Sequence, residues 1–404
     1  MQDTFHYVDG GVVAARGFLA SGISAGIKKS GARDLALIVA EEPCPAAAVF
    51  TRSSMAAAPV LFSRESIVSG TLKACIINSG NANACTGVAG LADARATASA
   101  VARELECDSS DVVVSSTGVI GVPLPLDPLL TSIPEAIHAL DNASGDAAAH
   151  AIMTTDTFVK QVAVSFELDG RTYTVGGMAK GSGMIMPDMA TMLGVITCDA
   201  PLTSSACDTA LRQAAAMTFN RITVDSDTST NDMVLLMASG AAGGDPIGED
   251  DRRYDVISSA IHEVCGELAR MIVKDGEGAT TFISVTVRGA LAEPDALDAA
   301  MSIANSPLFK TAIYGNDANW GRVAMAIGKS KARVAADRLE VIFAGIPVCR
   351  NGMAIPFDED EALAALSQPE VEVIADLHLG DGEATVWTCD LSYEYVRING
   401  EYRT

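Results

Sequence analysis

Short apolar runs alternate with longer amphipathic runs through residues 1–280, and this alternation limits the fold more than any other feature. Residues 34–40 (DLALIVA), 72–78 (LKACIIN) and 111–115 (DVVVS) are short, apolar and bounded by glycine or polar residues, as buried strands are. Residues 90–105 (GLADARATASAVAREL) have the spacing and composition of a helix. Strands that alternate with helices indicate a layered α/β domain.

A β-hairpin is predicted at residues 161–177. Apolar residues alternate on both sides of Asp169-Gly170, a dipeptide that favours the tight turn between two paired strands. Helical spacing predicts helices that could cover a sheet at residues 134–140, 147–153, 204–217 and 254–273.

The pattern changes at Thr281. Strands are predicted at 282–287, 339–343, 371–378 and 384–388, with a helix at 294–304. We therefore predict an α/β protein in two parts. A layered α-β-β-α sandwich is expected over residues 1–280, and a smaller C-terminal α/β domain over residues 281–404.

The charge of the chain excludes several classes of partner. It has 51 acidic against 28 basic residues, a net charge of −23. Nucleic acids and anionic membrane surfaces are bound by clustered Lys and Arg, so neither is expected as a partner. Residues 1–10 lack the basic and apolar regions of a secretory signal, and no apolar run approaches the ~18 residues of a membrane helix. The protein is expected to be cytoplasmic.

The residues that usually bind metals are dispersed along the chain. Nine cysteines show no CxxC spacing, and the histidines, which show no HxH or HxxxH spacing, are His6, His138, His150, His262 and His378. We therefore predict no metal site. No glycine-rich phosphate loop of the GxGxxG or GxxxxGK[ST] type is present, so no bound cofactor is expected.

The segment 176–200 (GGMAKGSGMIMPDMATMLGVITCDA) carries the strongest chemical signal. Lys180 lies between glycines, which allow a close approach of the backbone. Thr191 directly precedes a predicted buried strand at 192–197, so its hydroxyl could be exposed at the end of a glycine-rich loop. These residues alone do not distinguish a nucleophile from an ordinary junction between a loop and a strand.

A chemical route exists that would make Thr191 a nucleophile. Attack of its hydroxyl on the carbonyl of Ala190 would convert the peptide bond to an ester, whose hydrolysis frees an α-amine. That amine has a reference pKa of about 7.7–8.0 and could act as the base that a threonine hydroxyl needs. The small side chain of Ala190 leaves room for the tetrahedral intermediate. Such a chain could perform acyl transfer without a histidine triad.

Several long motifs resemble those of one enzyme family. The run 180–200 (KGSGMIMPDMATMLGVITCDA) closely resembles the self-cleavage segment of the ornithine/glutamate N-acetyltransferases. The likeness covers nearly the whole chain, with further motifs at 26–38 (GIKKSGARDLALI), 78–87 (NSGNANACTG), 115–121 (SSTGVIG), 151–157 (AIMTTDT), 225–232 (DSDTSTND), 276–280 (GEGAT), 314–322 (YGNDANWGR) and 394–404 (EYVRINGEYRT). The chain is therefore identified as a member of this family.

The resemblance implies which residues perform the chemistry. Thr191, freed by cleavage after Ala190, would carry the acyl group. The oxyanion hole would lie at Thr117 and Gly118, in a turn that follows a predicted strand. Two pieces are expected, an alpha chain of residues 1–190 and a beta chain of residues 191–404, which would assemble as an α2β2 heterotetramer.

Charged residues are expected to hold an amino-acid substrate. Lys180, a lone cation in an apolar loop, suits the substrate carboxylate, and Glu277 suits its ammonium group. Because Glu277 is flanked by glycines, it could also be a solvated turn residue. By the family pattern, further substrate contacts come from Thr154, Asn399 and Thr404.

The reaction implied by the resemblance is ping-pong. N-acetylornithine would acetylate Thr191, ornithine would leave, and glutamate would take the acetyl group. Some members of the family also accept acetyl-CoA as the donor, and the sequence leaves open whether this chain does.

Two positions depart from the family pattern, and two other functions remain open. Asp188 stands where the family commonly has Asn, which puts the rate of self-cleavage in doubt, and Thr281 stands where Lys is common. A hydrolase of the same architecture, such as the beta-peptidyl aminopeptidases, is the nearest rival function, and a non-catalytic amino-acid-binding regulator is the second. The polar loops predicted at 78–86 and 316–322 are either turns or supports for the site.

Overall fold

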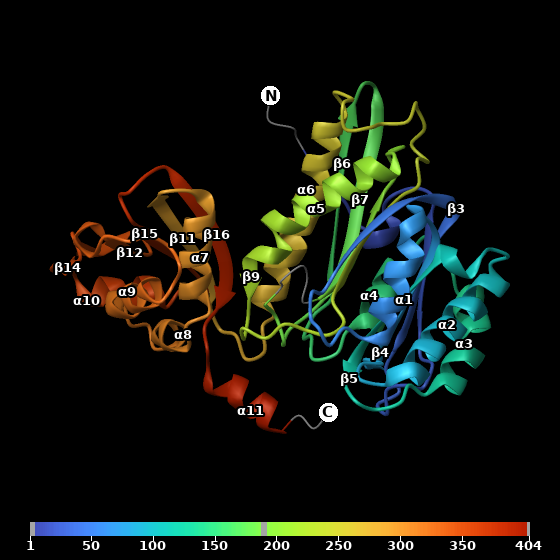
Figure 1. Ribbon diagram of the computed structural model, residues 1–404, viewed down its shortest axis with the longest axis horizontal. Coiled ribbons are helices and arrows are strands. Elements are labelled where there is room, and N and C mark those ends of the chain that lie inside the picture. The colour runs from blue at the N-terminus through green and yellow to red at the C-terminus, as the bar shows by residue number, and fades with distance from the viewer. Residues whose placement is uncertain (1–4, 187–191, 402–404) are drawn as a thin grey trace.

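The structure is a computed structural model that describes residues 5–186 and 192–401 (Figure 1). Two β-sheets, each covered by helices, make up a larger body, blue to yellow in the figure, and a smaller body, orange to red. The strands of the larger sheet follow the order β1-β6-β7-β8-β10-β3-β4-β5, and β2 pairs with β3.

The long strand β3 (Leu35–Phe50) gives the larger body two layers. Its first half pairs with β2 (Phe18–Ile23) and β4 (Thr71–Asn81), and its second half pairs with β10 (Met233–Ala238). The pairing with β4 shifts in register between Val39 and Cys44, beside Pro43. Such an irregularity bends a strand, so the sheet folds back on itself.

The two layers pack face to face around an apolar interior. One layer contains β2, β3, β4 and β5 (Val112–Val119). The other contains β1 (His6–Tyr7), β6 (Lys160–Leu168), β7 (Arg171–Lys180), β8 (Leu193–Cys198) and β10. Ile38 and Cys75 of the first layer share one buried cluster with Met178, Val195 and Leu235 of the second. Burial of these side chains holds the layers together.

Helices cover both outer faces of this pair of layers (Figure 1). The outer face of β6, β7, β8 and β10 packs against α5 (Ser204–Met217) and α6 (Tyr254–Lys274). The outer face of the other layer packs against α1 (Ala58–Ser66), α2 (Gly87–Glu104) and α3 (Leu126–His138), while α4 (Gly145–Ile152) packs into the interior cluster. The predicted helix-sheet-sheet-helix sandwich is confirmed.

The smaller body has its own sheet and core. Its strands follow the order β14 (Met353–Ala354), β13 (Ile346–Arg350), β12 (Glu340–Phe343), β15 (Glu370–Asp376), β11 (Phe282–Ala290), β16 (Gly382–Cys389) and β9 (Ile222–Thr223). Its helices are α7 (Glu293–Ala304), α8 (Pro307–Tyr314), α9 (Trp320–Gly328) and α10 (Glu359–Leu366). Strand β9 belongs to the sheet of the smaller body although it lies before residue 280. The division of the chain into residues 1–280 and 281–404 stays a proposal.

The last helix, α11 (Tyr393–Glu401), leaves the smaller body and returns toward the larger one (Figure 1). Single turns of 3-10 helix complete the described elements: η1 (Gly11–Val13), η2 (Ile67–Ser69), η3 (Ser109–Asp111), η4 (Phe219–Arg221) and η5 (Ala336–Arg338). The return of α11 brings Asn399 to the edge where β5 and β7 end.

Several sequence predictions need correction. Helix α3 begins at Leu126 rather than at residue 134, and Pro134 lies inside it, although proline usually marks a first turn. The predicted loop at 78–86 is strand as far as Asn81. The predicted loop at 316–322 ends at Asn319, whose side chain caps α9 by accepting a hydrogen bond from the Arg322 amide. The hairpin at 161–177 is confirmed, with Asp169 and Gly170 at its turn.

Candidate active site

A pocket of about 230 Å³ lies where strands of the two layers end. Strand β5 brings Thr117 and Gly118 to it, and β7 brings Lys180. The predicted site residues among the described ones all line it: Thr117, Gly118, Thr154, Lys180, Glu277 and Asn399. These residues come from five separate segments of the chain, so the fold gathers them into one place.

Four residues of interest lie outside the described ones: Ala190, Thr191, Thr404 and Asp188. Met192 follows Thr191 directly and lines the pocket. Strand β8 starts one residue later at Leu193, paired with Lys180 of β7 and with Met233 of β10. The chain therefore enters β8 from the pocket.

Thr117 and Gly118 do not lie in a turn after a strand, as predicted, but within β5, and the backbone there requires glycine at residue 118. Gly118 has φ of +130° and pairs with Gly80 of β4. A Cβ atom there would lie 2.4 Å from the carbonyl carbon of Gly80 and 2.6 Å from the amide nitrogen of Asn81. Asn231, two residues before β10, fixes this end of β5, because its Nδ2 donates to the carbonyls of Ala82 at 2.6 Å and Ser116 at 2.8 Å.

Lys180 is a buried cation at the end of β7, with only 8% of its surface exposed. Burial lowers the pKa of its ammonium group, while the negative charge of Asp156 raises it. A buried ammonium without full solvation is suited to bind a carboxylate.

The carboxylate of Glu277 faces the same pocket. Its backbone amide donates to the carbonyl of Ser182 at 2.9 Å. A Cβ on Gly183 would lie 2.5 Å from the Glu277 carboxyl carbon, so the glycine makes room for this side chain. Asn399 of α11 donates from Nδ2 to Glu277 Oε2 at 2.8 Å. The C-terminal helix thereby reaches the pocket.

A cluster of buried, paired charged side chains lies next to the pocket, and the sequence analysis did not predict it. The side chains of Asp156 and Lys160 are 0% exposed and that of Asp275 is 2% exposed. Lys160 Nζ donates to Asp156 Oδ1 at 2.7 Å and also to Asp275. Although burial opposes ionisation of Asp156, Lys180 and Lys160 hold the pKa of its carboxyl well below the usual range.

Asp156 also fixes two segments that line the pocket. Its Oδ2 accepts from the Thr154 amide and its Oδ1 from the Gly181 amide, both at 2.8 Å. Asp156 thus sets the position of Thr154 and of the backbone next to Lys180. Its place in the motif 151–157 was visible in the sequence, but its partners were not.

Asp225 likewise holds a backbone segment in position, here the loop that precedes the proposed cleavage point. It accepts from the amides of Met184 at 2.6 Å and Ile185 at 2.8 Å, and from the Tyr395 hydroxyl at 3.4 Å. Burial raises the pKa of Asp225. Both the loop and α11 are therefore tied to one carboxyl group.

The described residues show neither a metal-binding cluster nor a membrane-spanning helix. Within residues 5–186 and 192–401, no group of three or more His, Cys, Asp or Glu side chains could hold a metal ion. Among the helices of the same residues, none is long and apolar enough to cross a membrane.

Comparison with known proteins places the chain in a family. The arginine biosynthesis bifunctional protein ArgJ of Geobacter sulfurreducens is 48% identical over 96% of this chain and 99% of that protein. The protein of the same name from Symbiobacterium thermophilum is 48% identical over 98% and 100%. A crystal structure of the argJ protein of Bacillus halodurans is 42% identical with a TM-score of 0.50, over 51% of this chain and 97% of that one. A family model described as the ArgJ family matches residues 19–404, so the chain belongs to the ArgJ family.

Proposed function

We propose that this chain is an acetyltransferase of arginine biosynthesis that moves an acetyl group from N2-acetylornithine to glutamate, with Thr191 as the carrier. The observation that carries the proposal is the pocket. It gathers Thr117, Gly118 and Lys180 from the sandwich with Glu277 and Asn399 from later segments, beside the residue that follows Thr191. The named relatives act in arginine biosynthesis, which agrees with an amino-acid substrate.

Each residue of the site is given one role in this proposal. Thr191 Oγ attacks the acetyl carbonyl, and donors at Thr117 and Gly118 stabilise the resulting oxyanion. Lys180 binds the substrate carboxylate and Glu277 its ammonium group. Thr154 and Asn399 complete the substrate contacts, and Thr404, outside the described residues, adds one at the C-terminus. No metal or bound cofactor takes part.

The reaction proceeds in two balanced steps. In the first, a bond forms between Thr191 Oγ and the acetyl carbon, the C–N bond of N-acetylornithine breaks, and the hydroxyl proton passes to the leaving amine through the Thr191 α-amine. In the second, the amine of glutamate attacks the ester and the proton returns to Thr191 Oγ. Acetyl-CoA is a second donor in this proposal, used in place of N-acetylornithine.

Self-cleavage between Ala190 and Thr191 prepares the nucleophile. The matched chain of the Bacillus halodurans structure is about half as long as this one, which agrees with a protein that exists in two pieces. Strand β7 precedes the cleavage point and pairs with β8, which follows it, over six residue pairs. The pieces should therefore stay together without denaturant. The family resemblance supports an α2β2 assembly of such pairs, and the proposal places it in the cytoplasm.

The experiment is intact-mass analysis of purified protein under denaturing conditions. Wild-type protein is expected to give pieces of 190 and 214 residues (190 + 214 = 404), and Thr191→Ala is expected to stay whole and inactive. Fully active wild-type protein that remains one intact chain would rule out the proposal. Release of free acetate from N-acetylornithine as fast as transfer to glutamate would instead favour a hydrolase.

A further inference from the structure

The loop that precedes the proposed cleavage point is also part of the substrate pocket. Gly183, Met184 and Ile185 all line that pocket. Cleavage after Ala190 would place this loop near the new C-terminal end of the alpha chain. A chain end frays unless other residues tie it down. The loop can therefore keep its place in the pocket only if it is held there.

Asp225 holds this loop at two successive amides. Its Oδ2 accepts from the Met184 amide at 2.6 Å, and its Oδ1 accepts from the Ile185 amide at 2.8 Å. Met184 has a φ of +57°, a left-handed conformation that few residues other than glycine adopt. Such a conformation persists only where the surrounding structure fixes it. The two bonds to Asp225 fix it here.

Two further hydrogen bonds join the same segments. The Val224 amide donates to the carbonyl of Ile185 at 2.7 Å, and the Thr228 hydroxyl donates to the carbonyl of Met186 at 2.9 Å. Val224 and Thr228 lie after the proposed cleavage point, whereas the loop lies before it. In the cleaved protein these bonds would therefore hold the tail of the alpha chain on the beta chain.

The position of the loop also sets the space around Glu277. The Glu277 amide donates to the carbonyl of Ser182 at 2.9 Å, and the Ser182 hydroxyl donates to the carbonyl of Asp275 at 2.6 Å. Gly183 lies against the Glu277 carboxyl group, where a Cβ would come within 2.5 Å. Because the contact is this close, a shift of the loop would displace the carboxylate that is proposed to bind the substrate ammonium group.

We propose that Asp225 is a positioning residue that acts both before and after cleavage. Before cleavage, it holds the loop in the conformation that cleavage between Ala190 and Thr191 requires. After cleavage, it keeps residues 184–186 in the pocket as a fixed wall beside Glu277. Asp225 takes no part in making or breaking bonds. This inference rests on the proposed function, because it concerns the same cleavage and the same substrate.

The first test is Asp225→Asn. The amide group of Asn keeps one oxygen acceptor and replaces the other with N–H donors, which leaves one loop amide without its acceptor. We expect self-cleavage to slow by roughly tenfold, the loss typical of a hydrogen bond to a charged group, followed over time by intact mass. Once cleavage is complete, the KM for N-acetylornithine should rise about fivefold, and kcat should change less than about twofold. The proposed oxyanion donors belong to β5 and not to the loop, so turnover should be spared.

Asp227→Asn is the matched control. Asp227 lies two residues after Asp225 and is exposed, and the substitution is the same. Its self-cleavage, KM and kcat should equal those of wild-type protein. Equal behaviour of Asp225→Asn and Asp227→Asn would overturn the inference. So would an Asp225→Asn variant that loses kcat and stability together with KM, because that result would give Asp225 a merely structural role.

A second pair of variants tests the same segment without changing a charge. Thr228→Val replaces the hydroxyl with a methyl group of similar size and should slow self-cleavage about fivefold. Thr228→Ser keeps the hydroxyl and should cleave at the wild-type rate. If Asp225→Asn does not fold, this pair decides the inference, and equal rates in the two variants would overturn it.

Hydrogen exchange in the cleaved protein tests whether the loop stays in place. The amides of Met184 and Ile185 should be protected in wild-type protein and should exchange faster in Asp225→Asn. Rapid exchange of both amides in cleaved wild-type protein would overturn the claim that the alpha-chain tail stays in the pocket. Wild-type protein that neither cleaves nor transfers acetyl from N-acetylornithine would instead count against the proposed function.

Discussion

The two walls of the catalytic pocket are built in different ways. The wall formed by β5, β7, Thr154 and Thr155 rests on buried groups, among them the fully buried side chains of Lys160 and Asp156. The second wall is the part that α11 contributes through Asn399; no residue of this helix is buried among those described, and Tyr393 is 82% exposed. It reaches the pocket through Asn399.

This difference indicates that the two walls have different roles. Stabilising an oxyanion requires donors held to within a fraction of an ångström, which buried hydrogen bonds can provide. Holding a substrate tolerates a looser contact, which an exposed helix can provide. Changes to the buried wall should therefore affect turnover and stability, and changes to the α11 wall should mainly affect KM.

The largest effect is expected for Gly118→Ala on the buried wall. The new Cβ would lie 2.4 Å from Gly80 and would push β5 away from β4. We expect kcat to fall by about 10²–10³, the cost of one misplaced oxyanion donor. Gly121→Ala is the control, because Gly121 also has a positive φ of +80° but open space around its Cβ position. Similar losses in both variants would show that backbone strain, and not the clash with Gly80, is responsible.

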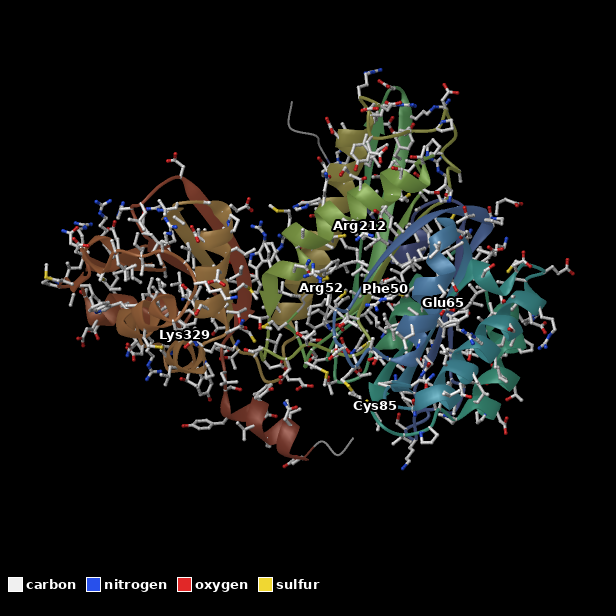
Figure 2. The ribbon with its side chains drawn as sticks, viewed as in Figure 1. Phe50, Arg52, Glu65, Cys85, Arg212 and Lys329 are labelled. Atoms are coloured by element: carbon white, nitrogen blue, oxygen red, sulfur yellow. The ribbon has the colours of Figure 1, made fainter. Side chains whose placement is uncertain are left out.

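The next effect is expected for Asp156→Asn. Loss of the carboxylate leaves a buried Lys160 with Asp275 alone, which should lower the free energy of unfolding by about 3 kcal/mol, measured by urea denaturation. Asp208→Asn is the control, because Asp208 pairs with Arg212 of α5, labelled in Figure 2, on the surface. Its loss should change stability by less than about 0.5 kcal/mol.

The same variant should change the pH profile. Burial and the positive charge of Lys160 lower the pKa of Lys180. The negative charges of Asp156, Asp232 and Glu277 raise it. Without the Asp156 charge the pKa of Lys180 falls further, so the ammonium form is lost at lower pH. The basic limb of kcat/KM for N-acetylornithine should therefore move to lower pH. An unmoved basic limb would show that Lys180 does not bind the substrate as a cation.

A smaller effect on turnover is expected for Glu277→Gln, at the residue whose carboxylate accepts the hydrogen bond from Asn399. The KM for N-acetylornithine should rise at least tenfold, because a charge-assisted hydrogen bond contributes about 1.5–3 kcal/mol, while kcat should change less. Self-cleavage must be confirmed first by intact mass. Unchanged kcat and KM would mean that Glu277 is only a turn residue.

The smallest effect is expected for Asn399→Ala on the exposed wall. Loss of its hydrogen bond to Glu277 should raise KM about fivefold, equivalent to about 1 kcal/mol, with kcat and stability nearly unchanged. Arg397→Ala, which removes an ion pair within α11, should leave KM unchanged. A large loss of kcat in Asn399→Ala would contradict the claim that changes to the α11 wall mainly affect KM.

The sequence predicted the layers of the fold because apolar periodicity is a local signal. It did not predict the full length of β3, since Pro43 and Pro45 resemble the end of a strand and lie instead at a bend. The buried supports of the site were also missed. Thr157 bonds to Asp275, 118 residues away, and Asn231 bonds to Ser116, 115 residues away. Partners this far apart show no regular spacing in the sequence. The residues of the pocket were indicated by the family motifs and, for Lys180 and Glu277, also by their charge.

The central claim is that Thr191 carries the acetyl group, and one mass measurement tests it. Cleaved wild-type protein is incubated with N-acetylornithine in the absence of glutamate, denatured in acid and weighed. The piece that begins at Thr191 should be heavier by one acetyl group, should release ornithine in equal amount, and should return to its original mass when glutamate is added. Steady transfer of acetyl to glutamate without any acetylated piece, at every time sampled, would contradict the account.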